Sequence, residues 1–135
     1  MKYDIRDIGT RIGEDFFKEG QKFVLSLEGD CLVYVAGDTE HMEPLHQVIA
    51  ETAGLTQVLG GGHLWVKQQE LIFFDRSGTY GGVPPEVMRS LAQPLLEKYR
   101  TLKEDIATVA VFTQADRETY QKWQSVLKKL PFETG

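Results

Sequence analysis

Apolar and polar residues alternate in several segments of the chain, which is the pattern of half-buried β-strands. Phe23, Leu25 and Leu27 fall on one face of the first such segment, and a turn at Gly29-Asp30 then leads into a second apolar run. We therefore expect a strand, a tight turn and a strand. The strands predicted along the whole chain are residues 22–27, 31–36, 55–59, 64–66, 71–74 and 108–112.

Glycine and polar residues punctuate the middle of this pattern. The run 60–62 interrupts the short strand at 55–59, and a polar turn at 67–70 joins the next two strands as a hairpin. Residues 1–20 have apolar positions at roughly helical spacing that Gly9 and Gly13 break, so no element is assigned there.

Apolar residues at spacings of three and four predict a helix that begins near His41 and ends at Gly54. Its apolar face consists of Leu45, Val48, Ile49 and Thr52. His46, five residues after His41, lies off the face that carries His41, so we interpret His46 as a surface residue.

The same spacing predicts two more helices. One opens at Pro84-Pro85, and Pro94 should kink it. Its apolar face consists of Val87, Leu91, Leu95 and Tyr99. The other covers residues 116–130 and should dock on the sheet. Its apolar face consists of Tyr120, Trp123, Leu127 and Leu130.

Strands that follow one another partly through hairpins and partly across helices predict one mixed β-sheet flanked by helices, an α/β (α+β) fold. The length of 135 residues is typical of a single domain, which we assign to residues 1–135.

Composition excludes several classes of protein. The net charge of -5 argues against a nucleic-acid partner, because clustered Lys and Arg supply that affinity. No segment approaches the ~18 apolar residues of a membrane span, so we expect no membrane partner. Cys31 is the only cysteine, which excludes an internal disulfide and a cysteine-rich metal site. These observations favour a cytoplasmic location and leave the oligomeric state open.

His41 is a candidate catalytic residue because it lies at the predicted start of a helix. A helix N-terminus attracts anions and disfavours a protonated imidazole, so His41 should be mostly neutral at pH 7 and able to act as general base or nucleophile. The alternative is that His41 is a solvent-exposed or capping residue. A three-histidine zinc site with His46 and His63 has no recognised ligand spacing, so no metal is expected.

Two glycine-rich segments are candidates for binding an anion. The run 60–62 either lets the backbone approach a ligand or forms a bend between strands. The stretch 75–82 combines Arg76, two hydroxyl side chains and glycines that can turn N–H groups toward one point. Its alternative reading is a flexible surface loop.

Four segments occur in an order that resembles the Janus/Ocnus family, whose enzyme members are small protein phosphohistidine phosphatases. The segments are Lys22-Phe23-Val24-Leu25, Thr39-Glu40-His41-Met42-Glu43, Leu59-Gly60-Gly61-Gly62 and Ser77-Gly78-Thr79-Tyr80-Gly81. They cover about residues 20–112, and the helix at 116–130 extends beyond them. The family has arginine after its glycine run, whereas this chain has His63.

The resemblance implies metal-independent hydrolysis of the phosphorus–nitrogen bond of phosphohistidine in a protein or peptide, without a cofactor. His41 would be the catalytic residue, as general base or nucleophile. The substrate-binding residues would be Lys22, Gly60, Gly61, Gly62, His63, Ser77, Gly78, Thr79, Tyr80 and Gly81. Two alternatives are a non-catalytic module that binds phosphate or a phosphorylated residue, and a structural or partner-binding protein.

Overall fold

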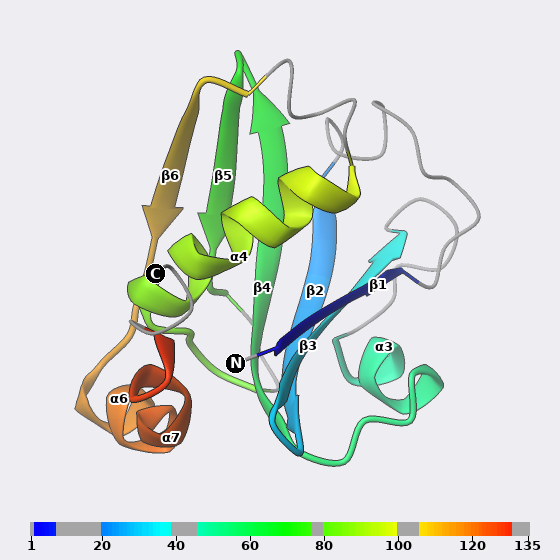
Figure 1. Cartoon of the computed structure of the whole chain (residues 1–135), viewed down its shortest axis with the longest axis vertical. Helices are drawn as coiled ribbons and strands as arrows, with labels where there is room; N and C mark the ends of the chain where they lie inside the picture. Colours follow the sequence, from blue (N-terminus) through cyan, green and yellow to red (C-terminus); the bar gives the residue numbers. More distant parts are fainter. Residues whose placement is uncertain (1, 8–19, 39–45, 77–79, 100–105, 131–135) are drawn as a thin grey trace.

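The computed structural model describes residues 2–7, 20–38, 46–76, 80–99 and 106–130 (Figure 1). The strands are β1 (Lys2–Asp7), β2 (Gln21–Glu28), β3 (Cys31–Asp38), β4 (Val58–Lys67), β5 (Glu70–Phe74) and β6 (Thr108–Phe112). The helices in the described part are α3 (His46–Thr52), α4 (Pro85–Lys98), α6 (Arg117–Lys122) and α7 (Gln124–Leu127). None of them combines the length and hydrophobicity needed to cross a bilayer.

The strands form one sheet in the order β1-β3-β2-β4-β5-β6. The outer pairs, β1 with β3 and β5 with β6, are parallel, and the three inner pairs are antiparallel. The predicted mixed sheet flanked by helices is therefore confirmed. Strand β1 was not predicted, because Lys2–Asp7 is too short for its alternation to stand out from the apolar spacing that follows it.

The glycine run does not interrupt a strand, and this prediction was wrong. Strand β4 continues through residues 60–62 and pairs with β2 along the run. At Gly62 an added Cβ would meet the carbonyl oxygen of Phe74 and lie 2.9 Å from Cζ of Phe23. The glycines thus allow close packing around β4, and the chain does not change direction there.

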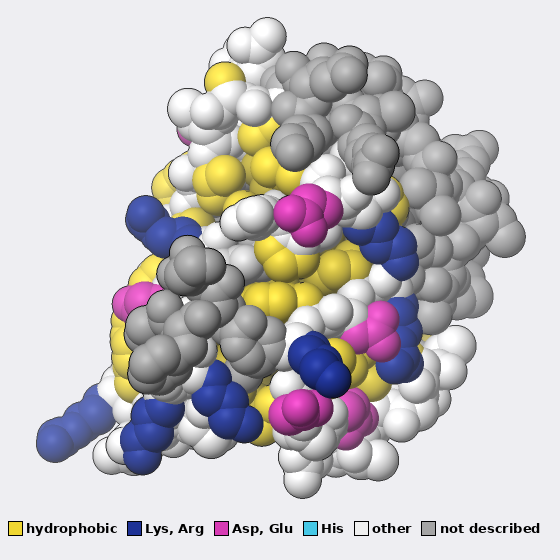
Figure 2. All heavy atoms as spheres, in the orientation of Figure 1, with side chains coloured by type: hydrophobic (Ala, Val, Ile, Leu, Met, Phe, Trp, Pro, Cys, Tyr) yellow, Lys and Arg dark blue, Asp and Glu magenta, His cyan; other side chains and the backbone are white. Residues whose placement is uncertain are grey.

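Helix α4 covers one face of the sheet and supplies the larger core. Its predicted apolar face is buried as expected, and the helix continues through Pro94 to Lys98. Figure 1 shows α4 crossing in front of the strands, with α6 and α7 at the lower left. Figure 2 shows the same side, where apolar patches alternate with charged side chains and none of the described side chains in view has the histidine colour.

The C-terminal segment docks as predicted, but as two short helices that meet at Trp123. The Trp123 side chain is fully buried, and its Nε1 donates a hydrogen bond to the Gly82 carbonyl at 3.2 Å. Tyr120 is 38% exposed rather than docked, because its hydroxyl reaches Glu86 at 3.1 Å on the surface of α4.

Helix α3 covers β2 and β3 on the opposite face. Its buried residues are His46, Ile49 and Ala50, whereas Val48 and Thr52 of the predicted apolar face are exposed. The helix is therefore rotated relative to the prediction, because Ile49 and Ala50 pack against valines of β2 and β3.

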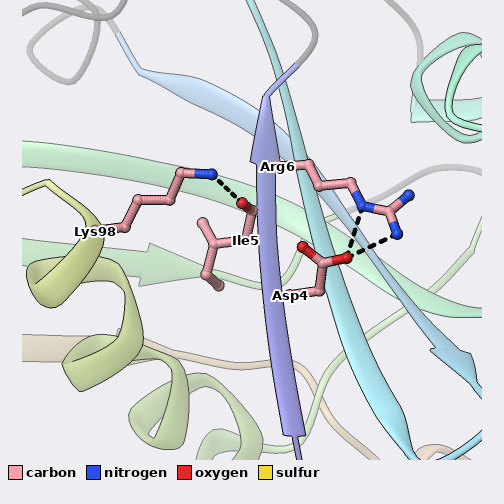
Figure 3. A network of polar contacts seen from close by, with 4 residues as sticks. All are labelled: Asp4, Ile5, Arg6 and Lys98. Carbon is pink, nitrogen blue, oxygen red and sulfur yellow. Dashed lines mark hydrogen bonds and ion pairs between the residues drawn. The ribbon is translucent and has the colours of Figure 1, made fainter.

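Strand β1, at one edge of the sheet, makes a polar contact with α4. The Lys98 ammonium group donates to the Ile5 carbonyl, as Figure 3 shows. The neighbouring ion pair between Arg6 and Asp4 measures 2.7 Å, but both side chains are about half exposed. Water screens such a pair, so we expect it to contribute less than ~1 kcal/mol.

Candidate functional site

The pairing of β2 with β4 places Lys22 directly opposite His63 on the face that α3 covers. Side chains alternate along a strand, so Gly61 belongs to the same face as His63 and leaves that part of β4 without a side chain. Helix α3 starts beside this stretch, with His46 as its first residue. Three residues from separate elements thus meet around the glycine run.

His46 is buried, so its interpretation as a surface residue was wrong. The side chain is 7% exposed, and Nε2 lies 2.9 Å from the Gly62 carbonyl oxygen. A carbonyl only accepts hydrogen bonds, so Nε2 carries the proton and the neutral ring has its lone pair at Nδ1. The spacing of His46 with Ile49 and Ala50 is the sequence signal that could have indicated this burial.

His63 fills the space between His46 and Trp65. Its ring stands edge-on to His46 with centroids 5.3 Å apart, and it stacks on the Trp65 indole at 5.4 Å. The ring also hydrogen-bonds to the backbone of Arg76, whereas Nδ1 is buried and has no hydrogen-bond partner among the described residues. Contacts with β4 and with the segment after β5 therefore fix the position of the His63 ring.

Both histidines are neutral at pH 7. Burial lowers the pKa of His63 to about 4, and the charges of Lys22, Arg76 and a protonated His46 act in the same direction. Burial and Lys22 also lower the pKa of His46, against the opposing effect of the Gly62 carbonyl. His63 thus differs from an arginine at this position, because it brings no charge at pH 7.

The positive charge of the site comes from Lys22 and Arg76. Neither is paired with a carboxylate in the part of the chain that the structure describes. Both charges lower the pKa of His63. We call Lys22, His46, His63 and Arg76 the His46 cluster. Its two cations give this part of a protein of net charge -5 a local positive charge.

The carboxylate of Asp75, the residue before Arg76, hydrogen-bonds to other segments of the chain. Asp75 is 2% exposed and accepts hydrogen bonds from the Val83 N–H at 3.1 Å, the Thr113 hydroxyl at 2.8 Å and the Gln114 N–H at 2.9 Å. These bonds fix both ends of the segment between β5 and α4. Sequence reasoning missed Asp75, since its partners come from a distant part of the chain.

A cleft of about 500 Å³ opens beside Arg76 and Tyr80. Its floor includes Gly81 and Gly82, and its opposite wall comes from residues 114–122, which carry acidic and basic side chains. The Lys122 ammonium group donates to the Tyr80 carbonyl at 3.2 Å across this cleft. The predicted binding residues Tyr80 and Gly81 thus line a hollow that shares Arg76 with the His46 cluster.

The remaining predicted site residues have different positions. His41, Ser77, Gly78 and Thr79 lie outside the described residues, so their roles stay predictions. Gly60 packs against Val83 and Trp123 in the core beneath α4, away from the cluster.

Within the described residues, no group of three or more histidine, cysteine or acidic side chains could hold a metal ion. Comparison of the chain with models of known protein families, with curated proteins and with solved structures found no match. The link to the Janus/Ocnus family therefore rests on the resemblance of the four segments alone.

Proposed function

We propose that the protein is a phosphohistidine phosphatase that hydrolyses the phosphorus–nitrogen bond of phosphohistidine in proteins or peptides without a metal. The observation that supports this function best is the His46 cluster, in which a neutral histidine of defined tautomer lies with two cations that have no carboxylate partner in the described residues. The order of the four sequence segments also supports a phosphatase function, through a resemblance in which His41 is the catalytic residue.

His41 lies outside the described residues, and we assign to His46 the chemical role that the sequence analysis predicted for His41. His46 lies in helix α3 near Lys22. Because Nε2–H donates to the Gly62 carbonyl, Nδ1 carries the lone pair and is the reacting atom. As a general base, Nδ1 takes a proton from water while the water oxygen attacks phosphorus, and the departing histidine nitrogen receives a proton.

As a nucleophile, Nδ1 of His46 would form its own bond to phosphorus while the substrate's phosphorus–nitrogen bond breaks. Water would then hydrolyse the phosphorylated His46 and regenerate the ring. Either route consumes one water molecule and releases inorganic phosphate. Both need His46 unprotonated, which its lowered pKa provides at pH 7.

Lys22 and Arg76 would neutralise the phosphoryl oxygens. A labile phosphorus–nitrogen bond needs positioning and charge stabilisation more than strong activation. Since His63 is neutral, the guanidinium group of Arg76 would replace the charge that the family's arginine carries after its glycine run. The cytoplasmic location belongs to the same proposal.

The decisive experiment measures phosphate release from a phosphohistidine peptide in the presence of a chelator, with spontaneous hydrolysis subtracted. His46→Gln can retain a hydrogen bond to Gly62 but has no ring nitrogen, so its rate should fall ~10²–10⁴-fold. His41→Ala is the matched comparison and should keep most of its activity. A large loss in His41→Ala with an active His46→Gln would return the role to His41.

Charge removal tests the cations. Lys22→Met and Arg76→Met keep the aliphatic stems, and each should lower kcat/KM ~10-fold or more, as expected for a lost charged hydrogen bond. Arg89→Met, on an exposed position of α4, is the control. A wild-type protein that binds phosphate at this site without turnover would instead be the non-catalytic binding module.

A further inference from the structure

Trp65 is held in place beside the His46 cluster, although the cluster's chemistry does not use it. One face of the indole stacks on His63, and the Phe74 ring lies 6.5 Å away on the neighbouring strand. The backbone of Gly20 approaches so closely that a Cβ there would lie 2.7 Å from Cδ1 of Trp65. The indole is therefore fixed in position while part of its surface stays exposed.

A groove of about 650 Å³ begins at this indole and follows the end of β4. Ile72, the register partner of Trp65 on β5, lies across from it, and Val66 adds further apolar surface. Lys67 and Gln68 of the β4–β5 hairpin close the far end. The mainly apolar lining suits an aliphatic or aromatic side chain with water-facing edges.

The groove adjoins the proposed phosphoryl site through Trp65, which lines the groove and stacks on His63 of the cluster. His63 in turn is the register partner of Lys22 and hydrogen-bonds to the backbone of Arg76, so the indole connects the groove to the cluster. The two cations complement a phosphoryl group, whereas the groove beyond them is mainly apolar. A ligand that matches both parts carries an anion and an apolar group a short distance apart.

Strand geometry sets that distance. His63 and Trp65 are two residues apart on β4, which corresponds to ~7 Å along the strand. An extended peptide that runs along the same direction advances by the same amount in two residues, and its side chains at these positions point the same way. The apolar side chain therefore belongs two residues from the phosphorylated residue.

We propose that Trp65 is a specificity-determining residue whose groove takes an apolar side chain two residues from the phosphohistidine of a polypeptide substrate. This inference rests on the proposed function. It goes beyond that function because phosphatase activity alone requires no preference for the flanking sequence. It also assigns the aromatic ring a role in selecting substrates rather than in the reaction.

The test compares phosphohistidine peptides that carry Leu or Ser two residues before or after the phosphorylated residue. The wild type should favour Leu over Ser in one of the two directions by at least ~10-fold in kcat/KM, as expected for a hydrophobic pocket. Trp65→Ala should reduce this ratio to below ~3-fold. The ratio is informative because a merely structural defect would slow both peptides alike.

Trp65→Ala can also disturb His63, which stacks on the indole, so two further variants serve as controls. Ile72→Thr changes a second apolar residue that lines the groove, keeps a β-branched side chain in β5, and should also lower the Leu-to-Ser ratio. Phe112→Ala removes an aromatic side chain that is 55% exposed and lines neither hollow, so its ratio should equal that of the wild type.

The possible outcomes separate the two proposals. Equal kcat/KM for all peptides with the wild type, or a Leu preference that survives both Trp65→Ala and Ile72→Thr, would overturn the role of Trp65 and leave the phosphatase function standing. A protein that releases no phosphate from any peptide or from phosphoramidate refutes the phosphatase function, and the specificity inference with it.

Discussion

Replacement of His63 by phenylalanine should change how the stability of the protein depends on pH. The pKa of His63 falls from 6.5 in the unfolded chain to about 4 in the folded protein. Between these values the unfolded chain binds a proton that the folded protein does not. The stabilisation is therefore complete above pH 6.5 and is lost progressively as the pH falls toward 4.

The size of this effect follows from the difference between the two pKa values. At ~1.4 kcal/mol for each pKa unit, the full difference corresponds to ~3 kcal/mol. His63 is only partly buried, so screening by water reduces the expected effect to ~2 kcal/mol. His63→Phe keeps an aromatic ring on Trp65 but cannot titrate, so its stability should fall less on acidification.

Urea denaturation, followed by circular dichroism at several pH values between 4 and 7.5, measures this difference. The free energy of unfolding of the wild type minus that of His63→Phe should rise by ~2 kcal/mol from pH 4 to pH 7. A difference that stays constant within ~0.5 kcal/mol would show that His63 does not titrate as its surroundings indicate. A direct NMR titration of the ring should then give a pKa near 6.5.

Two further substitutions test the packing that positions the site. Asp75→Asn places an NH₂ group among three donors that now share a carboxylate, so the free energy of unfolding should fall by at least ~2 kcal/mol in urea denaturation; an unchanged value would mean that these bonds do not fix the segment between β5 and α4. Gly62→Ala forces its Cβ against Phe23 and the β5 backbone and should cost ~2–3 kcal/mol. Gly29→Ala, at a positive φ with open space around it, should cost only ~1 kcal/mol, and equal losses in the two glycine variants would argue against close packing at β4.

Local patterns in the sequence predicted the elements that bury one face and expose the other. The alternation around Phe23 and Leu25 predicted the hairpin of β2 and β3, and the spacing of Val87 with Leu91 predicted the buried face of α4. Such patterns are readable because burial on one face repeats with the period of the element itself.

Tertiary structure decided the rest, because it depends on which distant segments become neighbours. The glycine run continues a strand since Phe23 and the β5 backbone crowd around it, and no local pattern records that crowding. The register between β2 and β4 joins Lys22 to His63, and the packing of α3 turns His46 toward Gly62. The sequence by itself thus indicated a site for an anion, while the pairing of strands and the burial they impose determined which of these residues meet and which of them are charged.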